Sequence, residues 1–498
     1  MGKVKYIYGA SIQGIQSFIF QTNELKDIVG GSELVEIICT SLFLDKFLQH
    51  GQRLMNAAGN IKCIYNDMAE CQKTILEFPK SIMTKAPGIT ISQAVVKTDE
   101  DELKFHFKEL MDTLECKLRI QRNKPAKSMT IGFMGVERSR KTGLPAICKE
   151  GNDFIDEGTL QKRKLSVGGE ATRKLCEKSF GQEVLSGNIA FNIKDLTDKN
   201  DWIAIIHADG NGLGQVVAKV GGDEVGLRNF SIKLDEATKQ AAHAAFKKVY
   251  TDEAYQQKSI IYPFRPVVLG GDDMTMICKA SLAIDYTKVY LEEFERATEQ
   301  KLGAGNGLTA CAGIAFIKSS YPFHYGYDLA EELCSQAKKI SKNDFIQKDE
   351  KNAPSSMMFY KVQGSFIESY EDMILKEKTP QEGHSFNFGP YFIHPTNTDE
   401  YWTVKDLEDN VATLQGRDGN TAKTDIRKWM STMHQNTEMA KQAADRSRSI
   451  LSSERLRNAF DKATTGISRT LSKGEVLYYP AADLLDLNTI LNQITRED

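Results

Sequence analysis

The stretch 267-VVLGGDDMTMI-277 consists of two short apolar runs that meet at Gly270-Gly271-Asp272-Asp273. Glycine tolerates a positive φ and lets a backbone approach a ligand closely, so this pattern predicts a tight hairpin with two carboxylates at its tip. Adjacent carboxylates repel each other unless a cation offsets their charge, which indicates a Mg²⁺ site. The alternative is a plain hairpin with a polar tip, because glycine and aspartate are common turn residues.

A second candidate strand, 202-WIAIIHAD-209, ends in an acid. Because side chains alternate between the two faces of a strand, Asp209 shares one face with His207 and two isoleucines. The other face carries Trp202 and small or aliphatic residues that can pack under helices. His207 is either a neighbour of a metal site or an ordinary strand histidine, and the second is the more common case.

The glycines that follow this strand, Gly210-Asn211-Gly212-Leu213-Gly214, also resemble a dinucleotide-binding turn. The spacing disagrees, because Gln215 stands where the last glycine of that motif belongs. An acid directly before the glycines would also repel a pyrophosphate in the absence of a metal ion. The sequence therefore disfavours a Rossmann-type site.

The elements around these two stretches follow the order β-α-β-β-α-β, which is the ferredoxin-like plan. Expected are strands at 202–208, 266–269, 274–278 and 308–317, and helices at 236–250, 282–298 (capped by Ser281) and 327–340. This plan places the first strand beside the hairpin, so Asp209 and Asp272 are expected to hold one or two Mg²⁺ ions. Two metal ions held by carboxylates are typical of in-line phosphoryl transfer.

The same order of elements is expected once more near the start of the chain. Strands are predicted at 4–10, 61–65, 89–96 and 129–136, and helices at 32–50 and 102–120. The fold class is therefore α+β, with two tandem ferredoxin-like domains over 1–137 and 201–380.

The remaining segments have a different character. Residues 138–200 are irregular and basic, and they are either a solvated linker or a nucleic-acid contact, with the linker at least as well supported. Residues 381–498 are expected to form a helical C-terminal domain. Its helices are predicted at 406–414, 424–433, 437–448 and 453–463.

Composition narrows the class of protein. The 498 residues carry 64 bases and 67 acids, a net charge of −3, which argues against a surface devoted entirely to nucleic acid. No apolar run is long enough to cross a membrane, and the N-terminus shows no signal peptide, so a cytoplasmic protein is expected. The nine cysteines include no CxxC pair, which predicts free, mostly buried thiols and no zinc site.

Lys338 and Lys339 close a predicted helix whose core stripe includes Leu329, Leu333 and Ala337. A lysine beside that stripe could reach a triphosphate across the sheet. It could equally be a cation that is favoured at a helix C-terminus. The residues alone leave these two interpretations open.

Together these features resemble the palm-domain nucleotidyl cyclases and polymerases, which include the GGDEF-type diguanylate cyclases. They are most similar to the large subunit of type III CRISPR effector complexes, the Cas-ten or Cmr/Csm large-subunit family. The matching segments are Gly14–Phe20, Ile28–Leu34, Asp209–Gly214, Gly270–Asp273, Cys311–Ala315 with Pro322 and Ala337-Lys338, and, loosely, Arg446-Ser447-Arg448. The likeness covers nearly the whole chain, and the second palm carries most of the motifs.

This resemblance implies a Mg²⁺- or Mn²⁺-dependent nucleotidyltransferase that makes cyclic oligonucleotides, most of all cyclic oligoadenylates from ATP, in antiviral defence. It implies that Asp209, Asp272 and Asp273 bind two metal ions. Gly270 and Gly271 would let the acceptor nucleotide lie against the hairpin. The donor triphosphate would meet Asn211, Gly212 and Lys338.

The sequence departs from the family pattern in three places. Asn211 stands where family members commonly place a second acid, so metal binding would rely more on Asp273. The chain opens directly in the first palm and contains no His-Asp dipeptide, so an HD nuclease domain is not expected. The first palm lacks a GGDD, and its Asn66-Asp67 is no substitute, so it is expected to be a degenerate structural partner.

Two further hypotheses compete with the synthase. The palms could instead be an idle scaffold that holds guide or target RNA and Cas-type protein partners, although a scaffold has no reason to keep like charges together. The chain could also be a stand-alone signalling synthase outside any CRISPR complex. A cyclase of this design needs two facing palms, which the first palm or a second copy in a homo-oligomer would supply.

Overall fold

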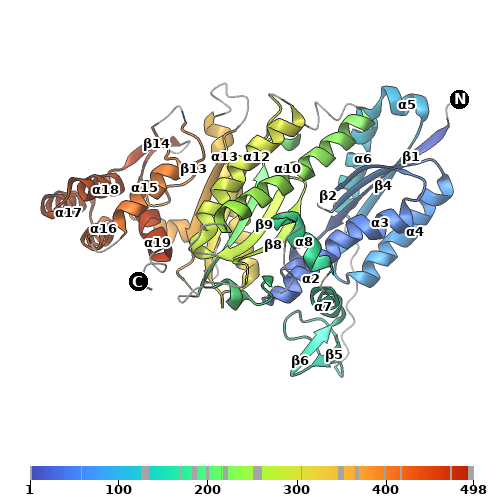
Figure 1. Ribbon diagram of the computed structural model, residues 1–498, viewed down its shortest axis with the longest axis horizontal. Helices are drawn as coiled ribbons and strands as arrows, with labels where there is room; N and C mark the ends of the chain where they lie inside the picture. Colours follow the sequence, from blue (N-terminus) through green and yellow to red (C-terminus); the bar gives the residue numbers. More distant parts are fainter. Residues whose placement is uncertain are drawn as a thin grey trace.

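The computed structural model describes most of the chain, with short gaps. The described residues are 3–57, 59–124, 134–168, 170–181, 188–197, 201–214, 216, 223–250, 261–303, 305–345, 353–364, 369–396, 399–415, 418–471 and 474–491. The first palm lies at one end of the molecule, the second palm at its centre and the helical C-terminal part at the other end (Figure 1). The mixture of helices and sheets confirms the predicted α+β class.

The first palm is built on a four-stranded antiparallel sheet with the order β2-β3-β1-β4. Its strands are β1 (Val4–Gln13), β2 (Gln52–Ala57), β3 (Asn60–Tyr65) and β4 (Thr90–Asp99). One face packs on α2 (Leu25–Ile37), α3 (Phe43–Phe47) and α4 (Met68–Lys85), and the opposite face packs on α6 (Phe107–Arg122). Short helices α1 (Ile15–Ile19) and α5 (Glu100–Phe105) complete the domain.

The ferredoxin-like order is present in the first palm, but two of its elements differ from those predicted. The second strand is Gln52–Ala57, and the second helix is Met68–Lys85. Thr90–Asp99 is therefore the fourth strand of the sheet, not the third. The helix that follows it lies outside the β-α-β-β-α-β order. Of the strand predicted at 129–136, residues 129–133 lie outside the described part, and 134–136 are not in a strand. The predicted element order was correct, and the strands at 4–10, 61–65 and 89–96 and the helices at 32–50 and 102–120 coincide with observed elements, but β2 and α4 were missed, so the places of the later elements in that order were wrong.

The second palm is built on a six-stranded sheet with the order β13-β11-β10-β7-β9-β8. The strands are β7 (Trp202–Gly210), β8 (Phe264–Gly270), β9 (Asp273–Lys279), β10 (Ala310–Lys318), β11 (Ser356–Lys361) and β13 (Tyr391–Phe392). The helices are α10 (Glu224–Tyr250), α12 (Ala283–Leu302) and α13 (Phe323–Phe345). Ser281 lies in a 3-10 turn, Ala280–Leu282, and does not cap α12, so the predicted cap was wrong.

The two faces of the second sheet have different neighbours. Ala204, Ile206 and Ala208 of β7 pack with α10 and α12 in one core, as the alternation predicts. Ile203 and Ile205 face α13 and the first palm in another core, which is continuous across both palms. The face of β7 that carries Asp209 is therefore the face turned toward the first palm.

The basic segment after the first palm is folded. It forms a hairpin of β5 (Ala146–Glu150) and β6 (Asp153–Asp156), followed by α7 (Glu157–Gly168) and α8 (Glu170–Phe180). Lys162 is fully buried and donates to the carbonyl of Phe18, and the buried Arg163 pairs with Asp27 at 2.8 Å. These two bases hold the segment on the first palm, so neither a solvated loop nor a nucleic-acid contact describes them.

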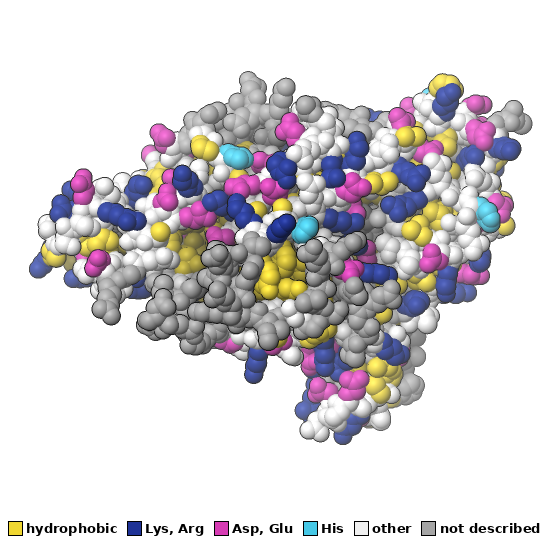
Figure 2. Space-filling model, in the orientation of Figure 1, with side chains coloured by type: hydrophobic (Ala, Val, Ile, Leu, Met, Phe, Trp, Pro, Cys, Tyr) yellow, Lys and Arg dark blue, Asp and Glu magenta, His cyan; other side chains and the backbone are white. Residues whose placement is uncertain are grey.

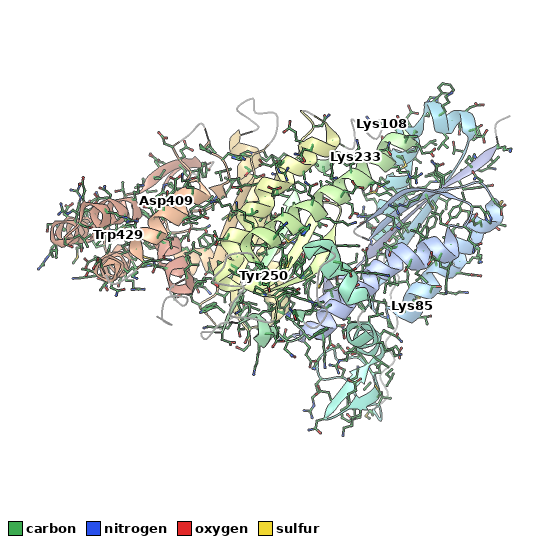
Figure 3. The ribbon with its side chains drawn as sticks, in the orientation of Figure 1. Lys85, Lys108, Lys233, Tyr250, Asp409 and Trp429 are labelled. Carbon is green, nitrogen blue, oxygen red and sulfur yellow. The ribbon has the colours of Figure 1, made fainter. Side chains whose placement is uncertain are left out.

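The C-terminal part is mainly helical, with a small sheet. Its helices are α14 (Tyr370–Met373), α15 (Val404–Leu414), α16 (Gly419–Met433), α17 (Thr437–Ile450), α18 (Glu454–Thr464) and α19 (Ala481–Leu491). A sheet of β12 (His384–Ser385), β15 (Gly474–Tyr478) and β14 (Ile467–Leu471) was not predicted. Trp429 of α16, labelled in Figure 3, packs against Phe386 and Tyr479 and joins this sheet to the helices.

The structure bears on three expectations from the composition: the mixed surface charge, the free thiols and the absence of a membrane span. Among the described residues, basic and acidic side chains are interspersed on the face seen in Figure 2. All nine cysteines are free and seven are buried, as expected. Within the described ranges, none of the helices combines the length and the apolar character that a membrane span requires.

Candidate active site between the palm domains

The Gly-Gly-Asp-Asp stretch forms a two-residue hairpin turn between β8 and β9. Gly270 pairs with Asp273, so Gly271 and Asp272 occupy the turn. Gly271 has a φ of 65°, which a type II′ turn needs at its first position and which other residues adopt at a cost. Thr238 of α10 donates to the carbonyl of Gly271 at 2.6 Å and fixes the turn on the helix behind it.

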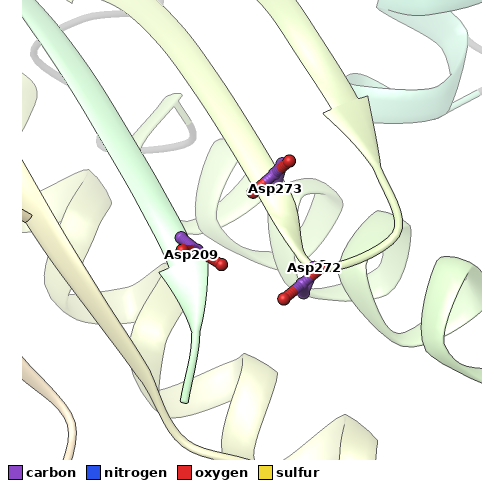
Figure 4. A group of neighbouring side chains, drawn as sticks. All are labelled: Asp209, Asp272 and Asp273. Atoms are coloured by element: carbon purple, nitrogen blue, oxygen red, sulfur yellow. The ribbon is translucent and has the colours of Figure 1, made fainter. Parts of the chain in front are cut away.

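The end of β7 lies next to this hairpin. His207 pairs with Thr275 across the β7–β9 ladder, which brings Asp209 beside Asp273. Asp209, Asp272 and Asp273 each offer a carboxylate oxygen, and these three oxygens lie within 4.8 Å of one another. Figure 4 shows the three side chains gathered at the tips of adjacent strands.

Mutual repulsion and burial change the protonation of this cluster. Burial, together with the charges of Asp273 and Asp209, raises the pKa of Asp272 to about 8. Burial and the charge of Asp209 raise the pKa of Asp273 to about 7, although Lys338 opposes the increase. Like charges held this close favour a divalent cation, and carboxylate oxygens are ligands that Mg²⁺ and Mn²⁺ accept. The residues present therefore fit a divalent metal.

Lys338 reaches the cluster from α13. Its ammonium donates to a carboxylate oxygen of Asp209 and to the carbonyl of Gly210 at 2.8 Å. The helix continues to Phe345, so Lys338 lies in its body and the helix-terminus interpretation does not hold. Lys338 therefore contacts the cluster through Asp209, and its charge also acts on Asp273.

A close approach of α13 to the sheet places this lysine. A Cβ atom on Gly313 of β10 would lie 2.0 Å from the carbonyl oxygen of Ala330 in α13 and 2.5 Å from the amide nitrogen of Cys334. Only glycine leaves room for that backbone. The segment Cys311–Ala315 therefore positions Lys338 by letting its helix lie directly on β10.

The other residues singled out from the sequence lie around the cluster in different ways. Asn211 is turned toward β10, where its amide donates to the Thr309 hydroxyl at 3.0 Å, so it does not join the acids. Gly212, with a φ of 71°, forms the turn after it. A Cβ on Gly270 would meet no atom within 4 Å, so the surface above the hairpin is open.

His207 is an ordinary buried strand residue in this structure. Its Nδ1 lies 3.2 Å from the Thr275 hydroxyl, and its ring meets Tyr327 edge to face. Burial lowers the pKa of His207 to about 4, which keeps the imidazole neutral. It does not contribute to the group of carboxylates that could hold a metal.

A cavity of about 320 Å³ connects the hairpin with the first palm. Its lining includes Gly270, Asp273 and Thr275 from the second palm, and Gln16 and Glu33 from the first. The volume is in the range of small-molecule sites.

Residues of the first palm and of α13 near this cavity were not predicted as site residues. Gln16 donates to the Tyr327 hydroxyl at 2.8 Å and to Glu331 at 3.2 Å, which links the two palms. Glu331 also raises the pKa of Asp273. The resemblance of Gly14–Phe20 to the family motif was the one sequence signal that pointed to Gln16, and nothing local pointed to Glu331.

Comparison with known proteins agrees with this arrangement. Residues 202–346 match the family model described as Cas10/Cmr2, second palm domain. A Csm1-Csm4 cassette in complex with pppApApA has a similar structure, with a TM-score of 0.62 and 14% identity over 99% of this chain and 70% of that chain. The cassette in complex with cA4 gives a TM-score of 0.59 at the same identity and coverage. No curated protein sequence matches the chain.

A further solved structure is similar over the same extent. The Csm1-Csm4 subcomplex of the type III-A CRISPR-Csm interference complex gives a TM-score of 0.56, 14% identity and coverage of 99% of this chain. At this level of identity the likeness establishes the fold. The resemblance drawn from the sequence is thus confirmed: residues 202–346 match the second palm domain of the Cas10/Cmr2 family, within a chain that has the fold of these Csm1-containing structures.

Proposed function

We propose that this chain is a nucleotidyltransferase that joins NTPs, ATP before others, into 3′–5′-linked cyclic oligonucleotides for antiviral signalling. The observation that carries the proposal is the cluster of Asp209, Asp272 and Asp273 in a domain that matches the Cas10/Cmr2 second palm. Similar structures were solved in complex with AMPPNP, pppApApA and cA4, which supports ATP as substrate and oligoadenylates as products.

The three aspartates would hold two Mg²⁺ or Mn²⁺ ions. When bound, such ions activate an attacking oxygen and neutralise the charge of a leaving pyrophosphate. The acceptor nucleotide lies against the hairpin, where Gly270 leaves open space. Lys338 binds the donor triphosphate, and Asn211 holds the turn that carries Gly212 to the same phosphates.

In the proposed reaction, the main contribution of the protein is to hold the acceptor and donor nucleotides in a reactive geometry. The acceptor 3′-hydroxyl attacks the α-phosphate of the donor, a new P–O bond forms, and the bond to pyrophosphate breaks. The rigid hairpin fixes the acceptor, and α13 fixes the donor through Lys338. Side chains of the first palm line part of the same cavity. The similar structures support a Csm4-type subunit as a proposed partner. Guide or target RNA is a further proposed partner, which rests on the family resemblance of the sequence.

Pyrophosphate release from ATP with Mg²⁺ or Mn²⁺ tests this function. We expect the wild-type chain to release pyrophosphate. The rate of release should fall by at least about 100-fold in Asp272→Asn/Asp273→Asn, the size of effect seen when a group that stabilises transition-state charge is removed. Asp235→Asn, a change of one half-buried acid of α10 that pairs with Lys239 and lies outside the cluster, serves as a matched control. Equal release by the wild type and the double variant would refute the assignment.

A further inference from the structure

A glutamine of the first palm is held in the wall of the cavity by two contacts to the second palm. Gln16 lies on α1, and its amide nitrogen donates to the Tyr327 hydroxyl at 2.8 Å and to a carboxylate oxygen of Glu331 at 3.2 Å. An ionised carboxylate only accepts hydrogen bonds, so the nitrogen of the amide, and not its oxygen, must face Glu331. The two contacts therefore fix the orientation of the amide group.

The amide oxygen of Gln16 is left available to a ligand. Among the described residues, the side-chain hydrogen bonds of Gln16 both start at its nitrogen, and its Oε1 accepts none. The residue lines the cavity together with Gly270 and Asp273. A hydrogen-bond acceptor of fixed orientation in a cavity wall suits a ligand that presents a donor at that point.

The contacts of Tyr327 place this acceptor close to the three clustered acids. The ring of Tyr327 meets that of His207 at 5.6 Å, and His207 pairs with Thr275 across the β7–β9 ladder. Asp209 and Asp273 each lie two residues from this pair, in the direction of the hairpin and on the same face of the sheet. Two residues of a strand span about 7 Å, so the acids and the acceptor border the same part of this face.

The proposed reaction brings a sugar to this place. The 3′-hydroxyl of the acceptor nucleotide has to lie at the three acids, since it attacks the α-phosphate of the donor there. The ribose that carries this hydroxyl then lies over the face between the acids and Gln16. Its 2′-hydroxyl is on the adjacent carbon of the ring, and it is a hydrogen-bond donor that deoxyribose lacks.

We propose that Gln16 accepts a hydrogen bond from the 2′-hydroxyl of the acceptor nucleotide and thereby selects ribonucleotides over 2′-deoxyribonucleotides. This inference rests on the proposed function and deepens it by assigning the class of sugar. A 2′-deoxyribonucleotide brings a C–H group to the same place and leaves the amide oxygen unpaired, which costs binding free energy. The base takes no part in this contact.

The variant Gln16→Met removes the acceptor and keeps the length of the side chain. Dissociation constants of AMPPNP and of its 2′-deoxy counterpart are measured by isothermal titration calorimetry with Mn²⁺. The wild-type chain should bind AMPPNP about 3- to 10-fold more tightly than the 2′-deoxy form, the contribution of one hydrogen bond. In Gln16→Met the two dissociation constants should be equal.

Three comparisons separate recognition of the sugar from structural support. Gln93 also makes two side-chain hydrogen bonds, to the Ile75 carbonyl and with the Tyr8 hydroxyl, but both stay within the first palm, so Gln93→Met should keep the wild-type preference. The 3′-deoxy form of AMPPNP lacks the hydroxyl that faces the acids, so its affinity relative to AMPPNP should be the same in the wild type and in Gln16→Met. Tyr327→Phe removes one contact that orients the amide and should lower the preference for ribose, which keeps the inference testable even if Gln16→Met does not fold.

The outcomes distinguish the inference from the function on which it rests. The same ratio of the AMPPNP and 2′-deoxy dissociation constants in the wild type and in Gln16→Met, or an unchanged ratio in Tyr327→Phe, would overturn the role of Gln16. An equally large change of the 3′-deoxy ratio would overturn it too, because Gln16 would then act on the sugar as a whole. Product formation from ATP would in each case still stand for the synthase. A preference for ribose that depends on Gln16, in a chain that makes no oligonucleotide, would support the inference and contradict the synthase.

Discussion

The ammonium of Lys338 donates to the Asp209 carboxylate and, at 2.8 Å, to the carbonyl of Gly210. It thereby joins a helix of the second palm to the end of the strand that carries one of the three clustered acids. Asp209 raises the pKa of Lys338, and Lys338 in turn opposes the rise in the pKa of Asp273. This contact ties the charge state of the acids to the residue proposed to bind the triphosphate.

Replacing Lys338 by methionine should raise the KM for ATP. The variant loses the ammonium that we propose contacts the triphosphate, so the KM for ATP should rise by about 10-fold or more, equivalent to about 1.4 kcal/mol. Lys339→Met, a change of the exposed neighbour on α13, is the control and should leave the KM as it is. Initial rates of pyrophosphate release over a range of ATP concentrations measure both values. Equal KM values for the two variants would count against this role.

Stability of the metal-free protein should depend on pH through Asp272 and Asp273. Their pKa values are raised to about 8 and about 7, so between about pH 4 and pH 8 the folded chain binds protons that the unfolded chain releases. This contribution to the free energy of unfolding is present at low pH and is lost as the pH rises through 7 and 8. A divalent ion should restore it, more strongly at pH 8.5 than at pH 6.

Thermal unfolding in EDTA and in Mn²⁺ at several pH values measures this effect. Mn²⁺ should raise the Tm of the wild type at pH 8.5 by several degrees, since about 1 kcal/mol corresponds to ~2–4 °C in a domain of this size. Asp272→Asn/Asp273→Asn lacks the repelling charges, so its Tm should be higher in EDTA at pH 8.5 and should not respond to Mn²⁺. An equal response of both proteins to Mn²⁺ would place metal binding elsewhere.

Alanine substitutions at two glycines of the second palm should impair different properties of the protein, its stability in one case and its nucleotide affinity in the other. Gly313→Ala forces a methyl group against the backbone of α13, so it should lower the free energy of unfolding by about 1–3 kcal/mol, the usual cost of overpacking. Gly270→Ala meets no atom within 4 Å, so the fold should keep its stability while the affinity for nucleotide falls. Denaturant unfolding and nucleotide titration of both variants separate the two effects. A Gly270→Ala chain with unchanged nucleotide affinity would exclude a nucleotide lying on the hairpin.

The sequence predicted the second palm better than the first, for physical reasons. The buried stripe of α4 consists of Cys71, Thr74, Phe78 and Ile82, two of which are weakly apolar, and Pro79 interrupts the helical pattern. The strand Gln52–Ala57 is short, lacks a regular apolar alternation and lies at a sheet edge. Both elements owe their structure to tertiary packing more than to local pattern. The strands of the second palm are instead buried along most of their length, and two of them meet at a glycine turn.

Some residues of the candidate site could be predicted from the sequence and others could not, for the same physical reasons. Asp209, Asp272 and Asp273 could be brought together from sequence because a hairpin and its neighbouring strand are local, regular elements. Glu33 and Gln16 could not be joined to them by pattern, because their place depends on how the first palm packs on the second sheet. The orientation of Asn211 toward Thr309 and Cys311 likewise depends on the start of β10, about 100 residues later in the chain.

Identification of the products by mass spectrometry tests the central claim most directly. The wild-type chain is incubated with each of the four NTPs and Mg²⁺ or Mn²⁺, beside the Asp272→Ala/Asp273→Ala variant, and binding of ATP is measured for both. We predict oligonucleotides from ATP, cyclic species among them, that are absent with the variant. A wild-type chain that binds ATP no better than the variant and forms no phosphodiester from any NTP would contradict the account.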